Sequence, residues 1–183
     1  MPETAQGQVT KTFTGTGNFS TAICWNGGTL PVAGDNLVID GTCTVDNNVG
    51  TNNVAYGTLT VGTGTVRTLN WAVGGTNRLN VTNIGSGSAT SNLDMTNGGT
   101  LIIRGTITTT TLNFTPGNGT IDLESTLTIP YIPTFNNLII GNSSAIVTLS
   151  VGTNVSGSLT VSGTLQLAGK SITLGDLQGV GTM

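Results

Sequence analysis

The segment Gly57–Val61 reads Gly-Thr-Leu-Thr-Val, and variants of it recur along the whole chain. Each copy centres on a triplet in which one residue separates two aliphatic ones. The seven triplets begin 22, 20, 22, 20, 17 and 21 residues apart. A repeat period of about 20 residues is typical of solenoids and repeat arrays. The aliphatic members, which we expect to form the core, are Leu37, Ile39, Leu59, Val61, Leu79, Val81, Leu101, Ile103, Ile121, Leu123, Leu138, Ile140, Leu159 and Val161.

Further short stretches between the triplets also alternate apolar and polar residues and are bounded by Gly and Asn. This alternation is typical of half-buried strands, and the small polar residues supply sharp corners between them. Two or three strands in a turn of about 20 residues predict an all-β fold, a parallel β-solenoid of about seven rungs. An antiparallel β-sandwich also has many short strands and is the alternative, although it has no reason to keep a regular beat.

The composition restricts the classes of partner. The 183 residues include 36 Thr, 28 Gly, 19 Asn and 12 Ser, whereas charged residues make up 7% and histidine is absent. A net charge of -3 with so few basic residues argues against nucleic-acid binding. The longest apolar runs are far shorter than the roughly 18 residues of a membrane span, so we expect no membrane insertion. A surface whose polar groups come mainly from Thr, Asn and Ser rather than from charged residues favours an extracellular location.

The N-terminal region does not follow the 20-residue repeat period. We therefore predict two regions, a tail and cap over residues 1–34 and the solenoid over residues 35–183, because terminal repeats must shield an open end. Phe19, Trp25 and Pro31 are the expected cap residues, with Trp25 as a plug over the first rung rather than a sugar-stacking platform. The first residues lack a signal-peptide pattern and no comparable cap follows the last rung, so we expect a segment or processed form of a larger secreted protein.

Cys24 and Cys43 are the only cysteines. In an extracellular protein they predict a disulfide that stabilises the fold by roughly 3 kcal/mol. The alternative is two buried free thiols that pack as small hydrophobic groups. Two thiols without histidine cannot complete a zinc site, and we expect no metal and no cofactor.

The sequence of the predicted cap and first rung is similar to that of a known class of bacterial repeat regions. Gly17-Asn18-Phe19-Ser20, then Trp25, Gly28 and Leu30-Pro31, then Gly34–Ile39 and Gly41–Asp46 resemble the opening of repeat regions in large secreted surface proteins and adhesins of Bacteroidetes-type bacteria. The resemblance implies an extracellular structural or adhesive module without catalytic residues. Its partners would be other copies of itself, neighbouring repeats, surface glycans or host cell-surface ligands. The last rung, which has no predicted cap, adds the expectation of head-to-tail stacking into a filament.

A polysaccharide-binding or polysaccharide-degrading β-helix protein is the second hypothesis, because parallel β-helices host lyases and hydrolases. Degradation would need clustered acid and base groups. Asp122 and Glu124 share the outward face of one strand and form the one plausible pair, while Arg78 lies two rungs away, too far for a shared site unless side chains converge. We predict an ordinary solvated pair and no catalytic residues. The candidate carboxylates are Asp35, Asp40, Asp46, Asp94, Asp122, Glu124 and Asp176.

Ice binding is the third hypothesis, since threonine is abundant on the predicted solenoid. That function needs two outward threonines on every rung, and only Thr58 and Thr60 provide such a pair along the repeated triplets. The sequence therefore disfavours this face as an ice-binding surface.

Overall fold

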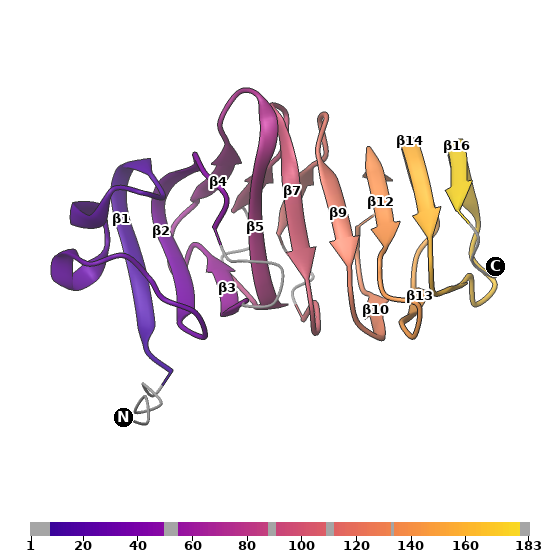
Figure 1. Ribbon diagram of the computed structural model, residues 1–183, viewed down its shortest axis with the longest axis horizontal. Coiled ribbons are helices and arrows are strands. Elements are labelled where there is room, and N and C mark those ends of the chain that lie inside the picture. The colour runs from indigo at the N-terminus through magenta and orange to yellow at the C-terminus, as the bar shows by residue number, and fades with distance from the viewer. Residues whose placement is uncertain (1–7, 50–54, 88–90, 109–111, 133, 180–183) are drawn as a thin grey trace.

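The computed structural model confirms the parallel β-solenoid of about seven turns, with its strands stacked side by side along the long axis (Figure 1). It describes residues 8–49, 55–87, 91–108, 112–132 and 134–179. No helix among these residues is long and apolar enough to cross a membrane.

The elements are short and almost all extended. They are β1 (Thr10–Asn18), η1 (Ala22–Cys24), η2 (Asn26–Gly28), β2 (Asn36–Val45), β3 (Tyr56–Val61), β4 (Thr68–Trp71), β5 (Gly75–Ile84), β6 (Asn92–Asp94), β7 (Gly98–Ile103), β8 (Asn113–Thr115), β9 (Thr120–Leu123), β10 (Leu127–Ile129), β11 (Thr134–Phe135), β12 (Asn137–Ile140), β13 (Ile146–Leu149), β14 (Thr153–Val161), β15 (Thr164–Gln166) and β16 (Ile172–Gly179).

The strands form three faces, which the chain visits in the same order on each turn. The first face contains the start of β2, β3 and the end of β5; the second contains the end of β2, β4, β6 and β8. The third face begins in the middle of β5 and continues through β7, β9, β12 and the ends of β14 and β16. Every named strand pairing is parallel, as a solenoid requires.

The register shows that the seven predicted triplets occupy two faces, not one. Leu37 pairs with Leu59 on the first face, but Leu59 then pairs with Ile84 instead of Leu79. Leu79 pairs with Leu101 on the third face, where the remaining triplets stack. The seven triplets therefore do not form one column, because β5 crosses two faces and carries Leu79 and Val81 on the third face and Ile84 on the first.

The core is continuous, but its composition changes along the column. Every predicted core residue is buried, none more than 3% exposed. In the N-terminal segment, which we define as β1–β8, five aromatic rings are also buried. In the C-terminal segment, β9–β16, Phe135 is the one buried aromatic residue among those described, and Leu, Ile and Val fill the rest. The five N-terminal rings belong to Phe13, Phe19, Trp25, Tyr56 and Trp71.

Gly99 shows why glycine is needed inside this wider core. Its φ is +90°, and a Cβ at this position would lie 2.1 Å from Cδ1 of Trp71. The indole therefore packs directly onto the backbone of β7, which no residue with a side chain would permit. The backbone of Trp71 is also held in place, because Asn97 Nδ2 donates a hydrogen bond to the Trp71 carbonyl at 3.0 Å.

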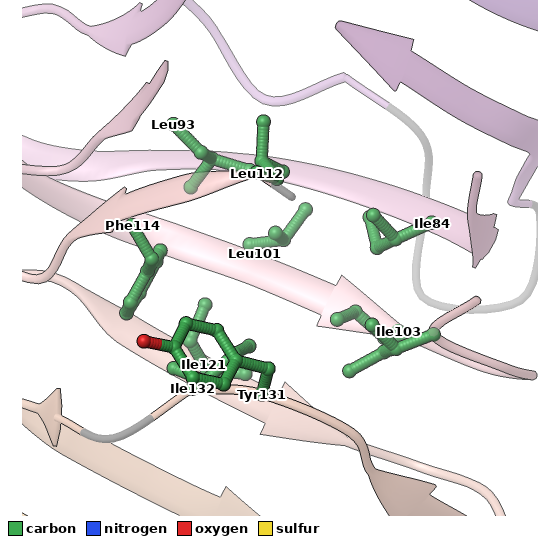
Figure 2. A pocket seen from close by; sticks show the side chains of 10 residues that line it. Ile84, Leu93, Leu101, Ile103, Leu112, Phe114, Ile121, Tyr131 and Ile132 are labelled. Atoms are coloured by element: carbon green, nitrogen blue, oxygen red, sulfur yellow. The ribbon is translucent and has the colours of Figure 1, made fainter. Parts of the chain in front are cut away.

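The two segments meet at a break in the sheet. Within the described residues β8 ends the second-face ladder, while β10 begins a separate sheet with β13 and β15, and β11 pairs only with β14. Of the ladders in the described part of the chain, only the third-face ladder crosses this junction, through β7 and β9. A small apolar cavity of about 30 Å³ lies there, lined by Leu101, Ile103, Phe114, Ile121 and Ile132 among others (Figure 2).

The N-terminal end begins with a strand, and the cap lies over it. β1 pairs in parallel with β2 over its full length, Thr10 with Asn36 through Asn18 with Thr44, so it belongs to the stack although it falls within predicted region 1–34. The covering turn contains η1 and η2. Asn26 closes the edge of β1, because Thr12 N donates to its Oδ1 at 2.9 Å and its Nδ2 donates to the Thr10 carbonyl at 3.4 Å.

Candidate functional site

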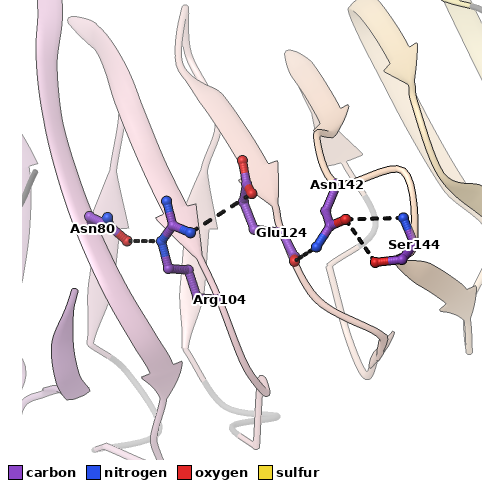
Figure 3. Close-up of polar contacts among 5 residues, drawn as sticks. All are labelled: Asn80, Arg104, Glu124, Asn142 and Ser144. Atoms are coloured by element: carbon purple, nitrogen blue, oxygen red, sulfur yellow. Dashed lines mark hydrogen bonds and ion pairs between the residues drawn. The ribbon is translucent and has the colours of Figure 1, made fainter. Parts of the chain in front are cut away.

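A row of charged and amide side chains crosses the third face in the middle of the column. Asn80 comes from β5, Arg104 follows β7, and Asp122 and Glu124 come from β9 and the residue after it. Asn80 is in register with Ile102 and, one strand further, with Asp122, while Arg104 and Glu124 follow Ile102 and Asp122 by two residues on the same strands. Figure 3 shows the row running from Asn80 through Arg104 and Glu124 to Asn142.

Arg104 connects the row. Its Nε donates to Asn80 Oδ1 at 3.1 Å, and its Nη1 lies 3.9 Å from Glu124 Oε2. The sequence analysis did not single out Arg104, although a signal was present, because it follows Ile102 by two residues as Glu124 follows Asp122. Asn142 extends the row by donating from Nδ2 to the Glu124 carbonyl at 3.0 Å.

Asp122 and Glu124 lie beside the same glycine. A Cβ on Gly141 would lie 2.7 Å from Asp122 Oδ1 and 2.8 Å from Glu124 Oε1, so the missing side chain makes room for both carboxylates. Asp122 Oδ1 is buried and accepts no well-aligned hydrogen bond from the described residues, although the Gly141 N–H lies near enough to favour its charged form. Burial, followed by the nearby negative charge of Glu124, raises the pKa of Asp122 to about 6.

Two arginines act against this shift. Arg104 and Arg78 both lower the pKa of Asp122, although by less than burial raises it. The charge of Arg78 on β5 therefore acts on this pair from two strands away, at the spacing that the sequence predicts. The row can bind a proton near pH 6, and the carboxylate pair is less solvated than we predicted.

The other candidate carboxylates bind local groups of the chain. Asp35 is buried and accepts hydrogen bonds from the backbone N–H groups of Val9 and Val32. Asp40 pairs with Arg67 at 3.4 Å. Asp46 accepts hydrogen bonds from Ser20, Asp94 accepts them from Thr96, and the side chain of Asp176 lies outside the described part of the structure. These contacts assign local structural roles.

The predicted cap residues come together at the N-terminal end. Trp25 is 2% exposed and packs edge-to-face on Phe13 and Phe19, with ring centroids 5.2 and 4.8 Å apart. Its Nε1 donates to the Phe19 carbonyl at 2.8 Å. Pro31 is also buried. In this structure the indole is covered and offers no open platform for a sugar ring.

The predicted disulfide is absent, since Cys24 and Cys43 are free thiols. Cys43 is buried, and its pKa is raised by burial, then by the charges of Asp46 and Cys24. Gly17 pairs with Cys43, and the Cys24 sulfur lies 3.2 Å from the position of a Cβ on Gly17. The two thiols therefore lie near each other, but the alternative of two buried free thiols holds for Cys43 alone, because Cys24 is only partly buried.

The outward residues of the third face do not form a threonine array. Asn80 and Ile102 are buried, and Arg78, Arg104 and Asp122 interrupt the row of hydroxyl groups. Thr58 and Thr60 lie on the first face instead, because β3 belongs there.

No protein-family model, curated protein or solved structure matches this chain. In the part of the chain that the structure describes, no three His, Cys, Asp or Glu side chains come close enough to hold a metal ion. The functional interpretation therefore depends on the geometry alone.

Proposed function

We propose that this chain is a structural or adhesive module of an extracellular or cell-surface protein, without enzymatic activity. The observation that carries the proposal is the third-face ladder, which runs from β5 to β16 through parallel pairings. Together with the buried core, this ladder makes a stiff column whose surface is mainly hydroxyl and amide groups. Such a column is suited to holding a binding surface at a distance, and its small number of charges fits an exposed position.

Neighbouring repeats are a better partner for this column than copies stacked head to tail. Head-to-tail stacking would place another chain against the outer edge of β1, where Asn26 already hydrogen-bonds to Thr10 and Thr12 and Trp25 pairs with Phe13. A covered edge resists strand addition. We therefore expect the purified chain to sediment as a monomer at concentrations where an uncovered edge would associate.

The location is tested by labelling intact and permeabilised source cells with an antibody against the solenoid. Equal labelling of intact and permeabilised cells, or recovery of the chain from the culture medium, supports the proposal. Labelling only after permeabilisation contradicts it. Beads coated with the chain then test adhesion, with beads carrying the heat-denatured chain as the control.

A polysaccharide-degrading activity is the second candidate, and the Asp122–Glu124 pair is the observation that favours it. A carboxyl with a pKa of about 6 beside a second carboxylate has the protonation state that a general acid needs. Release of reducing ends or unsaturated products from polysaccharides between pH 5 and 6, abolished in Asp122→Asn, would establish it. The absence of such products with an intact fold leaves the structural module as the function.

A further inference from the structure

A groove of about 400 Å³ opens on the second face beside the junction of the two segments. It is lined by Asn92, Leu112, Asn113, Phe114, Thr115 and Tyr131. The groove exists because β8 has no neighbouring strand on its far side within the described residues, and the chain after β10 passes it as the turn containing Tyr131. Figure 2 shows Tyr131 at the wall of the adjoining cavity, together with Phe114 and Leu112.

Tyr131 differs from every other aromatic residue of the chain. All aromatic residues lie in the described part; Tyr131 is 56% exposed, Phe114 is partly buried, and the other rings are at most 8% exposed. Phe114 packs against Phe135 with ring centroids 5.9 Å apart, which gives the groove a firm apolar floor. An exposed phenol presents an apolar ring face and a polar tip to a ligand.

The polar part of the groove consists of amide and hydroxyl groups. Asn92 and Asn113 are in register on neighbouring strands, and Asn113 Nδ2 donates to Asn92 Oδ1 at 3.3 Å. This contact orients two amides side by side, and each amide carries more donor and acceptor capacity than one bond uses. Thr115 adds a hydroxyl. None of the six lining residues is charged.

We propose that this groove binds a neutral saccharide. A sugar ring offers axial C–H groups that pack on an aromatic face and vicinal hydroxyls that both donate to and accept from amides, which matches a groove lined by Tyr131, Asn92 and Asn113. The uncharged lining and the net charge of -3 offer nothing to a phosphate or a polyanion. The binding site gives the adhesive part of the proposed function a ligand class, and in that respect it rests on the proposed function.

A purely apolar ligand fits the site less well. The cavity behind the groove has a volume of about 30 Å³, enough for one water molecule, whereas engineered cavities that bind benzene are about 150 Å³. Entry of an apolar molecule into the core would therefore require the solenoid to open. The ligand must stay in the outer groove, where half of the lining is polar.

The test is titration of the full chain with neutral and acidic oligosaccharides, followed by NMR. The neutral probes are cellohexaose, maltohexaose, xylohexaose and mannohexaose, and hexagalacturonate is the acidic probe. We expect at least one neutral probe to shift the Tyr131 ring and Asn113 side-chain signals. Tyr131→Ala should weaken that binding about tenfold or more, the effect of losing one ring contact, whereas Tyr131→Phe keeps the ring face and most of the affinity.

Ile23→Ala is the matched control, because Ile23 is 86% exposed and lies on the cap at the far end of the column. It should bind as the unmodified chain does. Binding of no neutral probe at about 10 mM, binding of the acidic probe alone, or equal affinity in Tyr131→Ala would each overturn the proposal. This experiment uses purified protein, so its failure is distinct from a failure of the surface labelling that tests the proposed function.

Discussion

The N-terminal and C-terminal segments share one fold but fill it differently. The N-terminal segment buries five aromatic rings, covers its first strand with a cap, and shifts its repeated triplets from one face to another at β5. The C-terminal segment has a core that is aliphatic apart from Phe135, and it keeps its triplets on the third face from β9 to β16. Large rings need room beside the backbone, as Gly99 provides for Trp71, whereas aliphatic side chains fit between strands that carry side chains at every position.

The largest expected effect comes from removing the ring at the centre of the N-terminal segment. Trp71→Ala should lower the free energy of unfolding by about 3–5 kcal/mol, because it leaves a large cavity around a fully buried side chain. Leu149→Ala in the C-terminal segment removes less volume and should cost about 2–3 kcal/mol. Urea denaturation measures both, and a larger loss in Leu149→Ala would contradict the comparison of the two cores.

Alanine substitutions at two glycines distinguish the free-energy cost of a packing clash from that of backbone strain. Gly99→Ala should cost about 3 kcal/mol, because it adds a clash with Trp71 to the strain of a φ of +90°. Gly169 has a φ of +76° with no atom within 4 Å of an added Cβ, so Gly169→Ala should cost only about 1 kcal/mol. Equal losses in the two variants would show that the indole does not pack on Gly99.

The Asp122 carboxyl, beside the junction, should make stability fall as the pH rises. Its folded-state pKa of about 6 lies above the ordinary value of 3.8, so the folded state binds the proton more tightly than the unfolded state. Stability from this group is present below pH 4 and is lost as the pH rises through 6. Asp122→Asn should therefore gain roughly 1 kcal/mol relative to the unmodified chain between pH 4 and pH 7.5, after allowance for solvent screening.

The control for that effect is Asp94→Asn. The Asp94 carboxylate accepts hydrogen bonds from Thr96, so its replacement should not increase stability at pH 7.5. Thermal unfolding of the three proteins across this pH range measures the difference. A loss of stability in Asp122→Asn at pH 7.5 would show that the carboxylate is stabilised by its arginine neighbours instead.

The smallest effect concerns the two thiols of the cap. Iodoacetamide should modify Cys24 faster than Cys43 in the folded chain, because Cys43 is fully buried and its pKa is raised. After unfolding without reductant, both thiols should be alkylated. If mass spectrometry shows that neither thiol is alkylated under these conditions, the two cysteines form the disulfide that the sequence predicts.

Much of the fold could be predicted from the sequence because the triplets on the third face follow the 20-residue repeat period. Leu101, Ile121, Leu138 and Leu159 stack as their spacing predicts. The switch between Leu59 and Leu79 could not be predicted, because an aliphatic triplet looks the same on either face and only strand pairing distinguishes them.

The candidate sites were less accessible to sequence reasoning. The Asp122–Glu124 pair follows from strand alternation, but the burial of Asp122 depends on side-chain packing across neighbouring strands. The groove at Tyr131 depends on where the second-face ladder ends. No local pattern around β8 marks that end, because Asn113–Thr115 alternates as the other strands do.

Native-state hydrogen exchange tests the division of the solenoid most directly. Leu93 lies in β6, which has paired neighbours on both sides, whereas Phe114 lies in β8 at the junction and is in register with it. We predict slow exchange of the Leu93 amide and exchange of the Phe114 amide that is many times faster, since its outward edge lacks a partner strand among the described residues. Equal, slow exchange at both positions would mean that the second-face ladder continues across the junction, and would contradict the two-segment structure.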